Sequence, residues 1–172
     1  TVSVNENGFL RMKLDHDKYV YLEGAALIHL IAEGNAKDSR TVINVELGSM
    51  VTEVQNKLSD KSSFEINSPS TTMAIRGTVT VTEVGYELGA QTMGDAISAE
   101  ALLQFLLERK GYVKKEAEAT PFLEEVFEMG VEAVVSNYVQ EGKVQISAYE
   151  KQQEADGTCR LVVVQVPLEE GN

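Results

Sequence analysis

A chain of 172 residues with 15 basic and 27 acidic side chains carries a formal charge of −12, which argues against a nucleic-acid partner or an anionic membrane surface. Hydrophobic residues make up 43% of the chain, so it is globular rather than disordered, and we expect one domain over residues 1–172. Cys159 is the only cysteine, which excludes an internal disulfide and a metal site built from several cysteines.

The first half of the chain has the pattern of short strands separated by turns. Apolar and charged residues alternate over 9–14, and further strand patterns follow at 18–22, 25–32, 41–47 and 50–58. Gly48 lies between the last two, where a glycine is typical of a bulge or a tight bend. Turns at intervals of about ten residues predict a mainly β fold, as an antiparallel sandwich, a roll or a barrel.

A strand pattern with an Arg-Gly-Thr sequence in its middle follows at 73–82. Apolar and polar residues alternate with a period of two through the whole stretch. This period assigns Met73, Ile75, Gly77, Val79 and Val81 to the core-facing side and Ala74, Arg76, Thr78, Thr80 and Thr82 to the other side. We therefore predict one long, kinked strand that crosses from one sheet to another. Arg76 has two interpretations: it ties this corner by donating to carbonyls or a carboxylate, which we favour, or it anchors an anionic ligand or a partner's carboxylate.

The second half changes from strands to helices and back. Asp95 or Ser98 is suited to cap a helix over 99–109, and Thr120 and Pro121 to begin a second one that runs to about Val135. Strand patterns return at 143–149 and 159–166, joined by a turn at 155–157. The sequence therefore predicts a two-helix insertion at about 89–136 within a β framework.

The apolar residues of this insertion must be buried somewhere. One interpretation is that the helices cover a sheet, and the other is that they bind a partner, as helices do in hydrophobic grooves. The candidate partner-binding residues are Leu102, Phe105, Leu106, Phe122, Phe127 and Met129.

The stretch from Lys18 to about Val84 resembles the FecR domain family, especially its versions in Gram-positive bacteria. Three segments carry the resemblance: GSMVTEVQNKL at 48–58, FEINSPSTTMAIRGT at 64–78 and EGKVQI at 141–146. The residues that match the family's pattern, for which we expect structural roles, are Gly48, Pro69, Arg76, Gly77, Thr78 and Gly142. The insertion at 89–136 departs from the family, whose connection at this place is short.

The resemblance implies an all-β, extracytoplasmic sensory or scaffold domain without enzyme activity. Founding members are periplasmic parts of anti-sigma regulators that relay the state of an outer-membrane transporter. Since the chain begins at Thr1, we expect a processed piece of a longer, membrane-anchored protein. We expect protein partners and no cofactor. The alternative is a carbohydrate- or small-ligand-binding β-domain of a cell-surface protein, which exposed aromatic residues would favour.

Residues with catalytic or metal-binding chemistry are few. His16 is expected in a solvated turn rather than a metal site, and His29 in the core. Cys159 is expected to be buried and inert. The sequence contains no G-x-S-x-G nucleophile motif and no phosphate-binding glycine loop, so we predict no enzyme activity and no metal.

Overall fold

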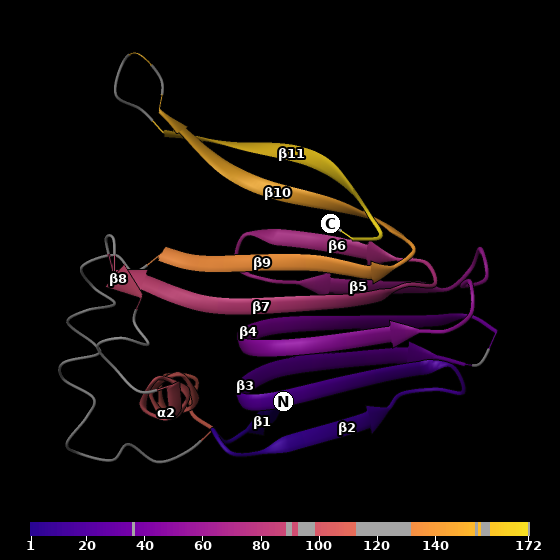
Figure 1. Ribbon diagram of the computed structural model, residues 1–172, viewed down its shortest axis with the longest axis horizontal. Helices are drawn as coiled ribbons and strands as arrows, with labels where there is room; N and C mark the ends of the chain where they lie inside the picture. Colours follow the sequence, from indigo (N-terminus) through magenta and orange to yellow (C-terminus); the bar gives the residue numbers. More distant parts are fainter. Residues whose placement is uncertain are drawn as a thin grey trace.

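The computed structural model describes residues 1–35, 37–88, 91–92, 99–112, 132–153, 155 and 159–171 (Figure 1). Within these ranges the fold is mainly β, with one helix, so the predicted fold class is confirmed at this level. The elements are β1 Val2–Val4, β2 Phe9–Lys13, β3 Lys18–Gly34, β4 Ser39–Val54, β5 Ser63–Asn67, β6 Thr71–Ile75, β7 Val79–Leu88, β8 Gln91–Thr92, α2 Ala99–Arg109, β9 Glu132–Glu141, β10 Lys143–Gln153 and β11 Cys159–Glu169.

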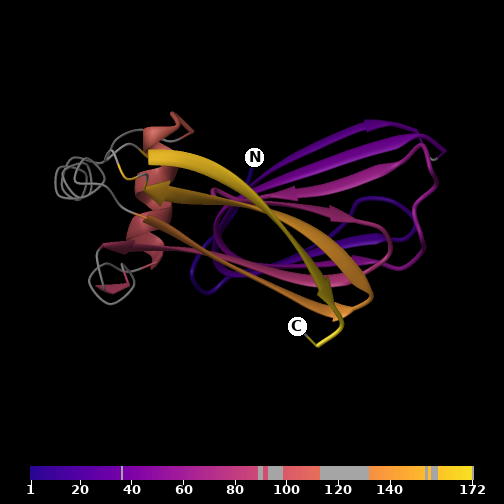
Figure 2. The ribbon, with the colours of Figure 1, turned by 90° about the horizontal axis from the view of Figure 1, so that it is seen from above.

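The long hairpin of β3 and β4 organises the sheet by bending near its middle. On one side of the bend, the start of β3 pairs with β2 and the end of β4 pairs with β7, which also pairs with β9. We call this the β7 half. On the other side, the end of β3 pairs with β1 and the start of β4 pairs with β5, followed by β6, β10 and β11. We call this the β5 half. Figure 2 shows the two halves as two layers.

Gly48 makes the bend possible. It has φ +92°, a conformation that side chains rarely adopt, and a Cβ on it would lie 2.3 Å from the carbonyl oxygen of Ala25. The β3–β4 register shifts at the same level, between Glu23 and Leu27. The bulge that the sequence predicted at Gly48 therefore lies where the hairpin turns from one half into the other.

One hydrophobic core lies between the two halves. It includes Val20, Leu22 and Met50 from the β7 half and Ile43, Phe64, Ile66 and Met73 from the β5 half, all essentially inaccessible to solvent. Because both halves contribute, neither would bury its apolar face alone.

The prediction of an antiparallel arrangement is wrong at one ladder. β4 and β5 pair in parallel, Arg40 with Ser63 through Asn44 with Asn67, so the sheet is mixed. The physical reason is the route of the chain. It leaves β4 at Val54 in the β7 half and crosses to the β5 half before β5 begins, where it runs in the same direction as the start of β4.

The predicted long strand through Arg76–Thr78 is two strands, and its alternation is reset between them. β6 pairs within the β5 half and β7 within the β7 half, so the predicted crossing is present. Gly77 has φ +88° at the crossing. After it, Thr78, Thr80 and Thr82 are buried while Val79 and Val81 are half-buried, contrary to our prediction. A left-handed residue rotates the chain, so the opposite set of side chains then faces the core.

The predicted helical insertion is correct in its first helix and wrong at its end. α2 has the predicted bounds, 99–109. However, Glu132–Ser136 belong to β9, which pairs with β7 from Glu132 to Glu141, and these residues include β-branched Val134 and Val135. The start of the second predicted helix lies outside the described residues. No helix in the described part of the chain is long and apolar enough to cross a membrane.

Candidate functional site

Three of the residues that carry the family resemblance, Gly77, Thr78 and Gly142, meet at one corner of the fold. Gly142, between β9 and β10, has φ +90°, and a Cβ on it would lie 2.6 Å from Cγ2 of Thr78 and 3.1 Å from the carbonyl oxygen of Gly77. The backbone amide of Val54 donates to the carbonyl of Thr78 at 2.9 Å. Gly48 lies at the bend of the hairpin, and Pro69 is exposed in the turn between β5 and β6.

Arg76 does not tie this corner. Its side chain is exposed, and within the described part of the chain it has no hydrogen bond or ion pair. The favoured interpretation of Arg76 as a structural tie is therefore wrong, because its exposed side chain has no partner to tie among the described residues. The change of direction coincides with the left-handed Gly77. The other interpretation of Arg76, as an anchor for an anionic ligand or a partner's carboxylate, stays a prediction.

Substitutions at Arg76 and Gly77 should therefore differ in their effects. Arg76→Ala is expected to change the free energy of unfolding by less than about 0.5 kcal/mol, as for an exposed side chain without partners. Gly77→Val should cost about 2–3 kcal/mol, because φ +88° strains a β-branched residue and Cβ would come within 3.2 Å of the Lys57 backbone. Urea denaturation measures both, and equal losses in the two variants would contradict this account of the corner.

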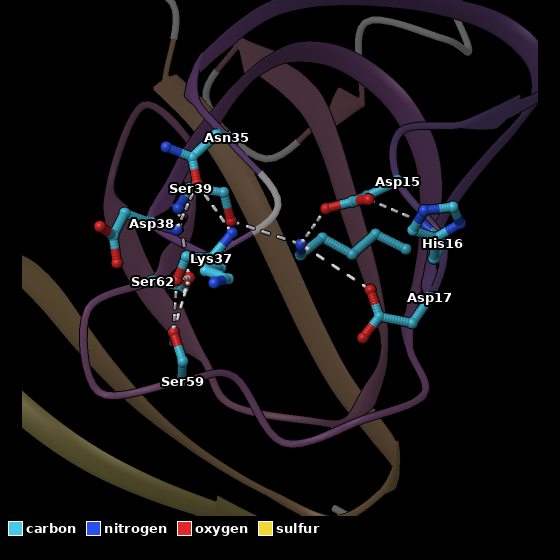
Figure 3. A network of polar contacts seen from close by, with 10 residues as sticks. Asp15, His16, Asp17, Asn35, Lys37, Asp38, Ser39, Ser59 and Ser62 are labelled. Atoms are coloured by element: carbon cyan, nitrogen blue, oxygen red, sulfur yellow. Dashed lines mark hydrogen bonds and ion pairs between the residues drawn. The ribbon is translucent and has the colours of Figure 1, made fainter.

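A buried lysine closes the nearby end of the core. Lys18 is 4% exposed. Its Nζ lies 3.0 Å from Oδ2 of Asp15 and 3.8 Å from Oδ1 of Asp17, and it donates to Oγ of Ser39 at 3.5 Å (Figure 3). Lys18 begins β3 in the β7 half and Ser39 begins β4 in the β5 half, so this network joins the two halves.

The turns at 35–39 and 59–62 extend the same network. The amide of Ser39 donates to Oγ of Ser62 at 3.2 Å, and Ser59 donates to the carbonyl of Lys37 at 3.1 Å. His16 lies here as well, exposed, with its backbone amide 2.7 Å from Oδ1 of Asp15. Among the described residues, no group of three or more His, Cys, Asp or Glu is placed to hold a metal ion. The network therefore connects turns.

Asp15 should make the stability of the domain depend on pH. The backbone amide of His16 and then the ammonium of Lys18 hold the pKa of Asp15 below its ordinary value. Its contribution is therefore complete above the unfolded pKa of about 3.9 and is lost as pH falls through the lower folded pKa. We expect Asp15→Asn to lower the melting temperature at pH 7 but to match the parent at low pH. Asp60→Asn, at an exposed position, is the control; a constant difference at every pH would contradict the assignment.

A second polar cluster lies where α2 ends on the outer face of the β5 half. Nε2 of His29 is 2.8 Å from Oε1 of Glu46, and Lys110 forms an ion pair with the same carboxylate. Nδ1 of His29 is 2.7 Å from Oγ1 of Thr1, and the ring of Tyr112 lies 5.6 Å from the imidazole. His29 is thus partly exposed beside charged groups rather than in the core. Sequence patterns missed this cluster because its members come from four segments: the N-terminus, β3, β4 and the residues after α2.

A pocket of about 370 Å³ adjoins this cluster. It lies between the last turn of α2 and strands β4, β5 and β7, and its polar lining includes Asn44, Asn67, Ser68, Tyr86 and Arg109. Nδ2 of Asn67 donates to Oδ1 of Asn44 at 3.1 Å, and Tyr86 donates its hydroxyl to the carbonyl of Glu46 at 2.8 Å. The volume is that of a small-ligand site.

The hydroxyl of Tyr86 should titrate late. Burial, and secondarily the negative charge of Glu46, raise the pKa of Tyr86 to about 12. The neutral form is favoured in the folded state, so its contribution to stability is present below about pH 10 and is lost as pH rises toward 12. A spectrophotometric titration should show a tyrosine with a midpoint near 12 that is missing in Tyr86→Phe. An unchanged titration curve in that variant would refute the assignment.

The candidate partner-binding residues on α2 are not available to a partner. Leu102, Phe105 and Leu106 are buried, together with Leu103, against Ala25, Leu27 and Leu47 on the outer face of β3 and β4. For this helix, covering the sheet is thus the correct interpretation. The other three candidates, Phe122, Phe127 and Met129, lie outside the described residues.

The outer face of the β7 half carries a group of aromatic residues whose association the sequence analysis did not predict. One row runs across its five strands and consists of Arg11, Tyr21, Val51, Val81 and Tyr138, with Tyr19 in the next row. We call these six residues the tyrosine face. Tyr138 is 45% exposed, and Phe9 at the edge is 65% exposed. The row was not predicted from the sequence because Val81 was assigned to the core face. It follows from the strand register of the structure.

No family model and no curated protein match the chain. Two crystal structures of a candidate anti-sigma factor from Parabacteroides distasonis ATCC 8503, at 1.65 Å and 2.50 Å resolution, match it with a TM-score of 0.49 and 10% sequence identity. Each match covers 98% of this chain and 59% of that chain, so this chain spans less than two thirds of the other protein's length. A likeness at this level supports no argument about function.

Proposed function

We propose that this chain is a FecR-like domain that acts outside the cytoplasm as a non-enzymatic sensory or interaction module of a membrane-anchored protein. In this role it binds a protein partner and passes its state to other segments of the full-length protein. The FecR-type sandwich is part of this proposal, with the two halves of the bent sheet as its layers.

The observation that carries the proposal is the contact of Gly142 with Gly77 and Thr78. These residues belong to two segments of the family pattern that are more than sixty residues apart, and the sequence offered only their order as a reason to connect them. A Cβ at position 142 would lie 2.6 Å from Cγ2 of Thr78, at a φ of +90° that side chains rarely adopt, so this position favours glycine. These two segments of the pattern thus meet at one physical corner, which supports the resemblance from a property that was not used to find it.

A second function, the binding of a carbohydrate or another small ligand, is favoured by the pocket at the end of α2. Its carboxamides, phenol and guanidinium are the groups that orient polar ligands. Saturation-transfer NMR with a panel of neutral and acidic monosaccharides tests it. Signals that vanish in Asn44→Ala but persist in the control Gln104→Ala would support this function, and their absence for the whole panel would count against a saccharide.

The location of the domain tests the principal proposal. The full-length protein is expressed in its host, and intact cells, with any outer membrane permeabilised, are treated with a protease. An antibody to this domain should lose its signal while a cytoplasmic marker remains intact. Protection of the domain until the cytoplasmic membrane is broken would contradict an extracytoplasmic role.

A further inference from the structure

We propose that the tyrosine face binds a protein segment that presents an arginine or lysine beside aliphatic side chains. This inference rests on the proposed function and names the surface and the chemistry of the partner. The basic side chain lies over the ring of Tyr138, and the aliphatic neighbours contact Val51 and Val81.

The face already contains two tyrosines that interact with cations. The guanidinium of Arg11 lies 5.0 Å from the ring centre of Tyr19 and 5.5 Å from that of Tyr21, and Nζ of Lys13 lies 5.7 Å from the ring of Tyr19. A cation within about 6 Å of an aromatic ring is attracted by the negative charge of its face. Two of the three rings of the tyrosine face thus have a basic partner from β2.

Tyr138 is the third ring, and in the described part of the chain it has neither a cation over it nor a hydrogen bond from its hydroxyl. It is also the most exposed of the three. Its direct partner across the ladder is Val81, and Glu83 is the diagonal neighbour on the same face of β7. An aromatic ring with a carboxylate at this spacing is suited to an arginine or lysine of another chain, which would stack on the ring and pair with Glu83.

Charge favours a basic partner over a second copy of this chain. The chain carries −12, and Glu23, Glu53 and Glu83 lie on this face of the sheet. Two copies would bring these carboxylates together, whereas a cationic segment is attracted from a distance and meets its counter-charges on contact. The partially buried valines between the tyrosines supply apolar area for the aliphatic neighbours of the basic residue.

Titration of the isotope-labelled domain with a capped peptide of alternating Arg and Val, followed by NMR, tests this inference. We expect saturable shifts centred on β7 and β9 that weaken with added salt, and weaker binding of a matched Glu/Val peptide. Tyr138→Ser should weaken binding by about threefold or more, since an exposed cation–π contact is lost. Tyr138→Phe should retain binding, because the ring face remains, and Glu83→Gln should weaken it.

The matched controls are Tyr112→Ser, which removes another exposed tyrosine, and Glu65→Gln, which neutralises a carboxylate on the β5 half. Equal binding by the parent and Tyr138→Ser, equal affinity for the two peptides, or no binding of the Arg/Val peptide would each overturn the inference. This failure can be distinguished from failure of the proposed function. If the domain lies outside the cytoplasm but does not bind this peptide, the proposed function stands and only this partner is ruled out.

Discussion

Gly48→Ala is expected to reduce the free energy of unfolding by about 3–5 kcal/mol, more than any exposed substitution in the domain. Two causes add. Alanine at φ +92° is strained, and its Cβ would lie 2.3 Å from the carbonyl oxygen of Ala25 and 2.8 Å from Cα of Ala26. The third near atom, Cβ of Ala26 at 2.8 Å, is fixed to the backbone, so no flexible side chain can move aside, and relief requires β3 and β4 to separate at the bend.

Gly85→Ala is the matched control for this variant. Gly85 is also a strand glycine, but φ there is not positive and no atom lies within 4 Å of the position that a Cβ would occupy. That variant should be neutral or slightly stabilising. Chemical denaturation gives both values. If Gly48→Ala unfolded at the same denaturant concentration as Gly85→Ala, the bend would not depend on Gly48.

Phe105→Ala is expected to cost about 3–5 kcal/mol, the range for deleting a buried phenylalanine. Phe105 is 3% exposed and lies between α2 and the outer face of β3 and β4, so its removal leaves a cavity beneath the helix. If α2 were instead a recognition element held loosely on the sheet, the variant would melt like the parent.

Gln104→Ala, one position earlier on the less buried side of α2, controls for helix propensity and should change stability by less than about 0.5 kcal/mol. The comparison decides between core and recognition roles for α2 without deleting 89–136. That deletion would also remove Glu132–Ser136, the first part of the ladder that β9 forms with β7.

Local sequence patterns predicted the elements that depend on residues close together in the sequence. The helix over 99–109 follows from its apolar spacing, and the bulge at Gly48 from a glycine between two strand patterns. The reset of alternation at Gly77 was not predictable in the same way. Gly77 has its positive φ where Lys57 and Gly142 pack against it, and these three segments meet only in the folded chain.

The parallel β4–β5 ladder and the cluster of His29, Glu46 and Lys110 were missed for a related reason. Both depend on the path of the chain after it leaves a strand. The alternation of residues within a strand does not determine which other segments lie beside it. The register that assembles the tyrosine face has the same origin. Tyr21 and Tyr138 are 117 positions apart by their numbers and share a row only because β4 and β7 lie between them.

The most direct test of this account is photo-crosslinking from position 138 in the full-length protein in its host. A photoreactive phenylalanine analogue replaces Tyr138, and in a parallel strain it replaces Tyr112. The account predicts a crosslink to a partner protein from position 138 only, mapped by mass spectrometry to a peptide with arginine or lysine beside aliphatic residues. Equal crosslinking from both positions, or a crosslinked peptide without a basic residue, would contradict it.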